Sequence, residues 1–213
     1  MKQGILWDLD GTLWDSSLQV YQAWNAYMQA HGLRRRFTRS DVRSYCGKTL
    51  DEIAAFVFPT MEKAQREEII NGCCEWENIP LAEHGGELFE DVEAVLAQLH
   101  GQYHMSVVSN CGLGYIEAFF QGNHTAQYFD DYENAARTGM GKAENIRLVM
   151  QRNGLDRAIY IGDTQGDANA AAKAGVPFVF AAYGYGDVPD AKWRIDKVNQ
   201  LPLILAKILP AEE

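Results

Sequence analysis

The sequence predicts an α/β fold: a doubly wound parallel β-sheet with an all-helical segment inserted after the first strand. In the C-terminal part of the chain, short apolar runs alternate with amphipathic helical stretches, which is typical of a parallel sheet covered by helices on both faces. Between the first apolar run and about residue 82 the patterns are helical alone. We therefore expect a core domain from residues 1–14 and 83–213 and a helical domain from residues 15–82.

The first strand is an apolar run that ends in Asp-Leu-Asp-Gly-Thr at residues 8–12. Residues two apart in an extended segment point to the same side, so Asp8 and Asp10 can face one site, and Gly11 permits a tight turn. Buried neighbouring carboxylates repel each other and lose hydration, so they persist mainly where a cation or a reaction needs them. The alternative interpretation is an ordinary strand end followed by an Asx turn.

The insert combines two long helical stretches with two capping boxes between them. These patterns lie at residues 15–31, at Thr38 with Asp41, at Thr49 with Glu52, and at about 60–77. Either Asp15 or Ser16 is available to cap the first helix. We expect the chain to pass between the two domains near residues 13–15 and again near 80–86.

The remaining elements belong to the sheet and its covering helices. Strands are expected at 105–108, 158–161 and 177–181, and helices at 92–99, 112–121, 142–153, 166–174 and 199–209. Ligands of such sheets bind outside the carboxyl ends of the strands, where Asp8 stands.

Polar residues follow two further strands and one loop. Ser109 and Asn110 come after the second strand, Lys142 follows a Gly-Met-Gly turn, and Asp163 and Asp167 come after the third strand. Each has an ordinary alternative: a helix N-cap for the serine, a solvated helix start for the lysine, and turn or first-turn acids for the aspartates. The same edge of a parallel sheet collects all of them, which favours one shared site.

Composition limits the function classes. The 213 residues are 47% hydrophobic, as expected for a globular protein with a sizeable core, and the formal net charge of -10 argues against a nucleic-acid partner. No run approaches the roughly 20 apolar residues of a membrane span. The four cysteines form no C-x-x-C pair, so we expect reduced thiols and a cytoplasmic protein.

Taken together, the four motifs resemble those of the haloacid dehalogenase-like (HAD) hydrolase superfamily, which carries them in this order on a Rossmann-like core. They are Asp-Leu-Asp-Gly-Thr-Leu, Ser-Asn, Gly-Lys and Gly-Asp-Thr-x-x-Asp. The resemblance covers nearly the whole chain, and the helical insert is similar to the family's cap in the phosphoglycolate-phosphatase-like branch. It implies a phosphatase that acts on a small phosphorylated metabolite.

The chemistry of a phosphate monoester agrees with this resemblance. A carboxylate that approaches the anionic phosphate is repelled unless positive charge lies between them, and Mg²⁺ prefers hard oxygen ligands. The implied catalytic residues are Asp8 as nucleophile and Asp10 as general acid and base. The implied phosphate-binding residues are Ser109, Asn110 and Lys142, and the implied magnesium site uses Asp8, Asp10 through its backbone carbonyl, Asp163 and Asp167.

The insert offers candidates for substrate contact. Lys48 lies where related enzymes place a specificity loop, and Lys48 or Arg43 can reach a carboxylate or second phosphate. The alternative is that these basic side chains are solvated. The aromatic residues at 21, 24 and 27 are expected in the core of the insert.

Two other functions remain open. A phosphotransferase such as a sugar-phosphate mutase uses the same core, although Gly162 stands where some mutases have glutamate. A non-catalytic phosphate-binding protein can share the fold. The substrate and the oligomeric state are not predicted.

Overall fold

The computed structural model describes residues 1–210. Its centre is a six-stranded sheet in the order β5-β4-β1-β6-β7-β8, and every neighbouring pair is parallel. The strands are β1 (Gln3–Trp7), β4 (His104–Ser109), β5 (Asp131–Asn134), β6 (Arg157–Gly162), β7 (Phe178–Ala181) and β8 (Trp193–Ile195). The predicted fold class is therefore confirmed.

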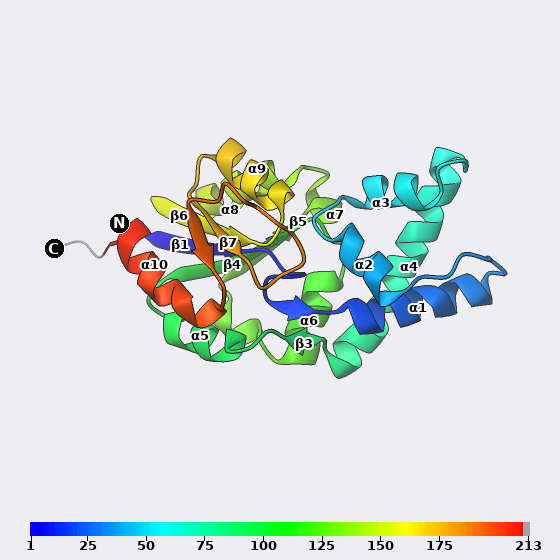
Figure 1. The fold of residues 1–213 in the computed structure, drawn as a ribbon, viewed down its shortest axis with the longest axis horizontal. Helices are drawn as coiled ribbons and strands as arrows, with labels where there is room; N and C mark the ends of the chain where they lie inside the picture. Colours follow the sequence, from blue (N-terminus) through cyan, green and yellow to red (C-terminus); the bar gives the residue numbers. More distant parts are fainter. Residues whose placement is uncertain (211–213) are drawn as a thin grey trace.

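Helices cover both faces of the sheet (Figure 1). One layer holds α8 (Lys142–Arg152) and α9 (Gln165–Ala174), and the other holds α5 (Val92–Leu99), α6 (Tyr115–Asn123) and α10 (Leu201–Ile208). Alternation along β1 sends Ile5 and Trp7 into the second layer's core and Leu6 into the first. All three side chains are fully buried, which explains why β1 is a continuous apolar run.

The segment after β1 forms four helices beside the sheet: α1 (Ser17–Ala30), α2 (Arg39–Tyr45), α3 (Leu50–Val57) and α4 (Lys63–His84). Both predicted capping boxes form, with Thr38 and Thr49 as N-caps. Trp24 and Tyr27 are buried where α1 packs, as expected, and the Trp24 ring meets Phe37 edge to face. We call α1–α4 the helical insert.

At the borders of the insert, one of the two cap candidates of α1 forms the bond and the predicted end of α4 is wrong. Asp15 Oδ1 accepts from the backbone N–H of Ser17, the first residue of α1, at 3.0 Å. The side chain of Ser16 makes no capping bond to α1, because its Oγ instead donates to Asp10. Helix α4 continues to His84 through Pro80, so the expected helix end near residue 77 is wrong. Where the chain leaves and re-enters the sheet domain, β2 (Trp14–Asp15) pairs antiparallel with β3 (Glu87–Leu88).

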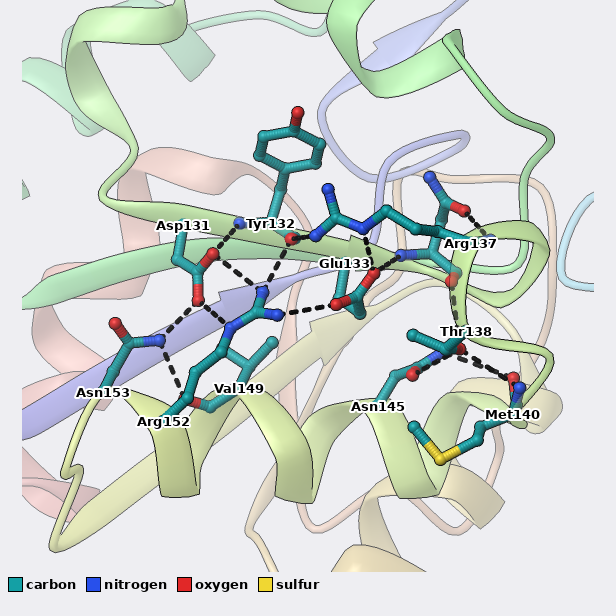
Figure 2. Close-up of polar contacts among 11 residues, drawn as sticks. Asp131, Tyr132, Glu133, Arg137, Thr138, Met140, Asn145, Val149, Arg152 and Asn153 are labelled. Carbon is teal, nitrogen blue, oxygen red and sulfur yellow. Dashed lines mark hydrogen bonds and ion pairs between the residues drawn. The ribbon is translucent and has the colours of Figure 1, made fainter.

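The strands β5 and β8 were not predicted, because β5 has a polar sequence and β8 is only three residues long. Figure 2 shows how β5 is fixed to α8. Arg152 on α8 donates to Asp131 at 2.6 Å and to Glu133 at 2.7 Å, and Arg137 donates to Glu133 at 2.7 Å from the short helix α7 (Ala135–Thr138). This network holds the helix that begins with Lys142 against the sheet edge.

Across residues 1–210, none of the helices combines the length and the apolar character that a membrane crossing requires.

Candidate active site

The predicted acidic residues converge at the carboxyl end of β1. Oxygen atoms of Asp8, Asp163 and Asp167 all lie within 4.8 Å of one another, and the three residues are buried. Asp8 follows β1, whereas Asp163 and Asp167 follow the neighbouring strand β6 and open α9. A parallel sheet therefore brings together residues that are more than 150 positions apart in the chain.

Lys142 supplies the one basic group of this cluster among the described residues. Its Nζ lies 2.9 Å from Asp8 Oδ1 and 2.5 Å from Asp167 Oδ1. Burial lowers the pKa of Lys142, but the neighbouring carboxylates of Asp167 and Asp8 outweigh that effect and hold the pKa well above its usual value. The lysine is therefore protonated, and it offsets one of the three negative charges.

The remaining carboxylates fit a cation. Burial, together with the charge of Asp167, raises the pKa of Asp163 to about 7 and that of Asp8 well above its usual value. Oδ2 of Asp163 accepts from the backbone of Tyr185 at 2.7 Å, while its Oδ1 is buried with no hydrogen-bond partner in residues 1–210. A set of hard oxygen donors with an excess of negative charge and one unpaired oxygen suits Mg²⁺.

Glycines make room for Asp163. Gly11 has a φ of +79°, and a Cβ on it would lie 2.2 Å from Asp163 Oδ2. A Cβ on Gly184 would lie 2.3 Å from Asp163 Cβ and equally close to the carbonyl oxygen of Gly11. Only glycine fits at both positions, so the turn after β1 and the loop after β7 can close around this carboxylate.

Asp10 is held apart from that cluster by two hydroxyl groups. Its Oδ1 accepts from Ser16 Oγ at 2.7 Å and from Tyr115 Oη at 2.8 Å, and those two hydroxyls lie 2.7 Å from each other. Burial raises the pKa of Asp10 in spite of these hydrogen bonds. The two carboxyl groups of the first motif thus have different surroundings, as an acid and a nucleophile require.

A cavity of about 80 Å³ lies between these aspartates and the helical insert, room for about five water molecules. Asp8, Asp10, Ser109 and Asn110 line it from the sheet domain. The Asn110 amide donates to the carbonyl of Gly47 in the insert at 3.0 Å, so the insert and the sheet domain meet at the rim of the cavity. Two of the predicted phosphate-binding residues, Ser109 and Asn110, therefore line the same cavity as Asp8. The third, Lys142, lies beside them through its contact with Asp8.

The two basic candidates of the insert are placed differently. Lys48 lines the cavity but is exposed, and its Nζ donates to the carbonyl of Ser44 at 3.0 Å. Arg43 donates to Asp15, and its guanidinium lies 5.3 Å from the centre of the Tyr185 ring. Arg43 therefore ties α2 to the strand that leads into the insert.

Three residues of the site were missed by the sequence interpretation. Tyr115 holds Asp10, the backbone of Tyr185 holds Asp163, and the buried Glu77 lines the cavity from α4. None of them belongs to a short motif, and each comes from an element that only the tertiary fold brings near the strand ends. The single available signal was Glu77, an acid on the otherwise apolar side of α4.

Comparisons with known proteins identify a family and several relatives. A family model described as haloacid dehalogenase-like hydrolase matches residues 5–181. A phosphoglycolate phosphatase from Cupriavidus necator is 27% identical over 230 residues, covering 97% of this chain and 95% of that protein. A phosphoglycolate phosphatase from Xanthomonas campestris is 25% identical over 207 residues, covering 94% and 93% of the two chains.

Solved structures share the fold at lower identity. A predicted phosphatase from Clostridium acetobutylicum superposes with a TM-score of 0.80 at 19% identity, over 97% of this chain and 99% of that one. CbbY from Rhodobacter sphaeroides, solved in complex with phosphate, superposes with a TM-score of 0.76 at 21% identity, over 94% and 96% of the two chains.

Proposed function

The chain belongs to the haloacid dehalogenase-like hydrolases, and we propose that it is a Mg²⁺-dependent phosphatase that hydrolyses a small phosphorylated metabolite through an aspartyl-phosphate on Asp8. The observation that carries the proposal is the convergence of Asp8, Asp163 and Asp167 around Lys142, with Asp10 held separately. Relatives named phosphoglycolate phosphatase support phosphate ester hydrolysis as the reaction class.

Asp8 is the nucleophile in this proposal. Its carboxylate attacks phosphorus, an oxygen–phosphorus bond forms on Asp8, and the bond from phosphorus to the ester oxygen breaks. Lys142, 2.9 Å from Asp8 Oδ1, offsets the negative charge that would otherwise repel the phosphate. Ser109 and Asn110, at the end of β4, offer a hydroxyl, an amide and backbone N–H groups to the other phosphoryl oxygens.

Asp10 moves the protons. It donates one to the leaving alkoxide in the first step and takes one from the attacking water in the second. Ser16 and Tyr115 hold the carboxyl group of Asp10 by hydrogen bonds to its Oδ1. The orientation of the Asp10 carboxyl group is therefore set before the substrate binds.

Asp8, Asp163, Asp167 and the backbone carbonyl of Asp10 would hold the magnesium ion. When bound, the ion supplies positive charge between the phosphate and the nucleophile. Asp167 also accepts from Thr164 through Oδ2 and from Lys142 through Oδ1, so its orientation is fixed.

The helical insert acts as a cap over this site. The cavity is enclosed partly by α1–α4, so the insert must move to admit substrate, and its return excludes water. We assign residues 15–82 to the cap and the rest to the core, with β2 and β3 at the two crossings.

The experiment is phosphate release from a panel of small phosphate esters with Mg²⁺, with EDTA, and with Asp8→Asn. We expect release that depends on the metal and is lost in the variant. Transfer of the phosphoryl group to another sugar phosphate, without release of free phosphate, would instead indicate a mutase. No reaction with any of the phosphate esters would contradict the proposal.

A further inference from the structure

The turn between α2 and α3, residues 46–48, reaches from the helical insert to two loops of the site (Figure 1). We call it the docking turn. Resting on the phosphatase function, we propose that the peptide of Gly47 docks between Asn110 and Thr164 to hold the cap closed, and that phosphate in the site strengthens this docking through Asn110. Asn110 is then a positioning residue for the cap as well as a phosphate ligand.

On one side, the docking turn accepts a hydrogen bond. Nδ2 of Asn110 donates to the carbonyl oxygen of Gly47 at 3.0 Å, and Asn110 directly follows β4. The amide nitrogen carries two hydrogens, so one can be donated to Gly47 while the other is donated to a phosphoryl oxygen. Asn110 also lines the cavity together with Asp8 and Ser109. The cap and the phosphate therefore share one amide group.

On the other side, Gly47 packs against a side chain whose position is fixed. A Cβ on Gly47 would lie 2.9 Å from Thr164 Oγ1 and 3.2 Å from its Cγ2. Oγ1 of Thr164 donates to Asp167 Oδ2 and accepts from the backbone N–H of Asp167, which holds the threonine at the start of α9. Gly47 also has a φ of +81°, a conformation that favours glycine. The close approach of the cap to this loop therefore requires glycine.

The docking turn is also a wall of the site cavity, because Cys46, Gly47 and Lys48 all line it. Undocking of this turn would therefore open the site to water. A phosphate that binds Asn110 favours the docked state, and docking favours the phosphate by the same free energy, since coupling between two binding events is reciprocal.

Two cysteines can report the opening of the cap without any turnover. Cys46 of the insert and Cys111 of the sheet domain both line the cavity. Burial raises the pKa of both thiols well above its usual value, so they stay protonated and react slowly with an alkylating reagent while the cap is closed. The rate at which iodoacetamide labels each cysteine, measured by mass spectrometry, therefore reports how often the cap opens.

The first measurement is labelling of the wild type with Mg²⁺ throughout, in the presence and absence of inorganic phosphate. We expect phosphate to slow the labelling of both cysteines by about fivefold or more, the lower end of typical coupling between two sites.

Gly47→Ala tests the docking itself. We expect faster labelling of Cys111 and a loss of the phosphate effect, because the added Cβ would collide with Thr164. The matched control is Gly32→Ala in the same insert. Gly32 has a φ of +67°, and no described atom lies within 4 Å of a Cβ placed on it, so this variant has the backbone strain without the contact. We expect it to be labelled as the wild type is.

Asn110→Leu tests the other side of the docking turn. It keeps the approximate volume of the side chain and removes the amide. Without phosphate, we expect it to raise the labelling rate of Cys46 about three- to tenfold, the effect of one lost hydrogen bond. Each variant is thus read from the cysteine of the domain that is not changed.

An undiminished phosphate effect in Gly47→Ala would overturn the proposal, because phosphate would then shield the thiols directly. Wild-type labelling that phosphate does not change, in an enzyme that releases phosphate from acetyl phosphate, would also overturn it and would leave the phosphatase function standing. Absence of acetyl phosphate hydrolysis would instead count against the phosphatase function. If Gly47→Ala does not fold, equal labelling of Cys46 in Asn110→Leu and the wild type would still contradict the docking.

Discussion

Glu77 has a consequence for stability that can be measured without any substrate. Its pKa rises from 4.5 to about 8 because the carboxyl group is buried, with Asp10 nearby. Between these two pH values the unfolded chain has lost the proton and the folded chain has kept it. The folded state binds more protons, so the free energy of unfolding falls as the pH rises through this window.

The perturbation is Glu77→Gln, which cannot titrate and can still accept from Trp24. Each pH unit inside the window costs the wild type about 1.4 kcal/mol. Between about pH 5.5 and about pH 7.5 the variant should therefore gain about 2–3 kcal/mol relative to the wild type. Other buried acids titrate in both proteins, so the difference between the two isolates Glu77.

The assay is urea unfolding of both proteins at the two pH values, followed by tryptophan fluorescence. Equal m values would show that both proteins unfold from equally compact states. A stability difference that stays constant between the two pH values would show that the pKa of Glu77 is not raised, because the side chain would then be ionised or in contact with water in the folded protein.

Three further outcomes are expected. Asp10→Asn should lower turnover of glycerol phosphate by about 10²–10⁴-fold and that of acetyl phosphate much less, because a good leaving group needs little protonation; equal losses would count against Asp10 as the acid. Mg²⁺ should raise the melting temperature of the wild type and not that of Asp163→Ala, and an equal rise in both would place the ion elsewhere. Arg152→Met should cost about 2 kcal/mol in urea unfolding, since it leaves the buried Glu133 with one partner fewer. The control Arg147→Met, at an exposed pair 4.0 Å apart, should cost less than about 0.5 kcal/mol, and similar losses in both arginine variants would contradict the role of the network.

The sequence predicted those parts of the fold that depend on local patterns. The apolar run of β1 and the capping boxes at Thr38 and Thr49 are short-range signals, and the elements they predict were found. Strand β5 was missed because its residues are polar: Asp131 and Glu133 are stabilised by Arg152 from α8, a contact that no local pattern contains.

The site residues likewise include some that the sequence predicts and some that depend on tertiary packing. Asp8, Asp163 and Lys142 follow or open elements of the sheet domain, so the topology of a parallel sheet was enough to predict that they meet. Tyr115 and Glu77 depend on how α6 and α4 pack near the strand ends, and their roles follow from hydrogen bonds that a sequence does not display. Ser16 shows why local patterns are not sufficient, since a residue suited to cap a helix instead donates a hydrogen bond to Asp10.

If Asp8 is the nucleophile, the phosphoryl group is bound covalently to it during each turnover. Acid quenching of the enzyme during turnover of acetyl phosphate traps this intermediate, and mass spectrometry of the peptide that contains residues 8–12 detects it. We expect an added phosphoryl group on Asp8. It should be absent from Asp8→Asn and more abundant in Asp10→Asn, where hydrolysis of the intermediate is slowed. Phosphate release by the wild type with no phosphoryl group on this peptide would show that Asp8 is not the nucleophile.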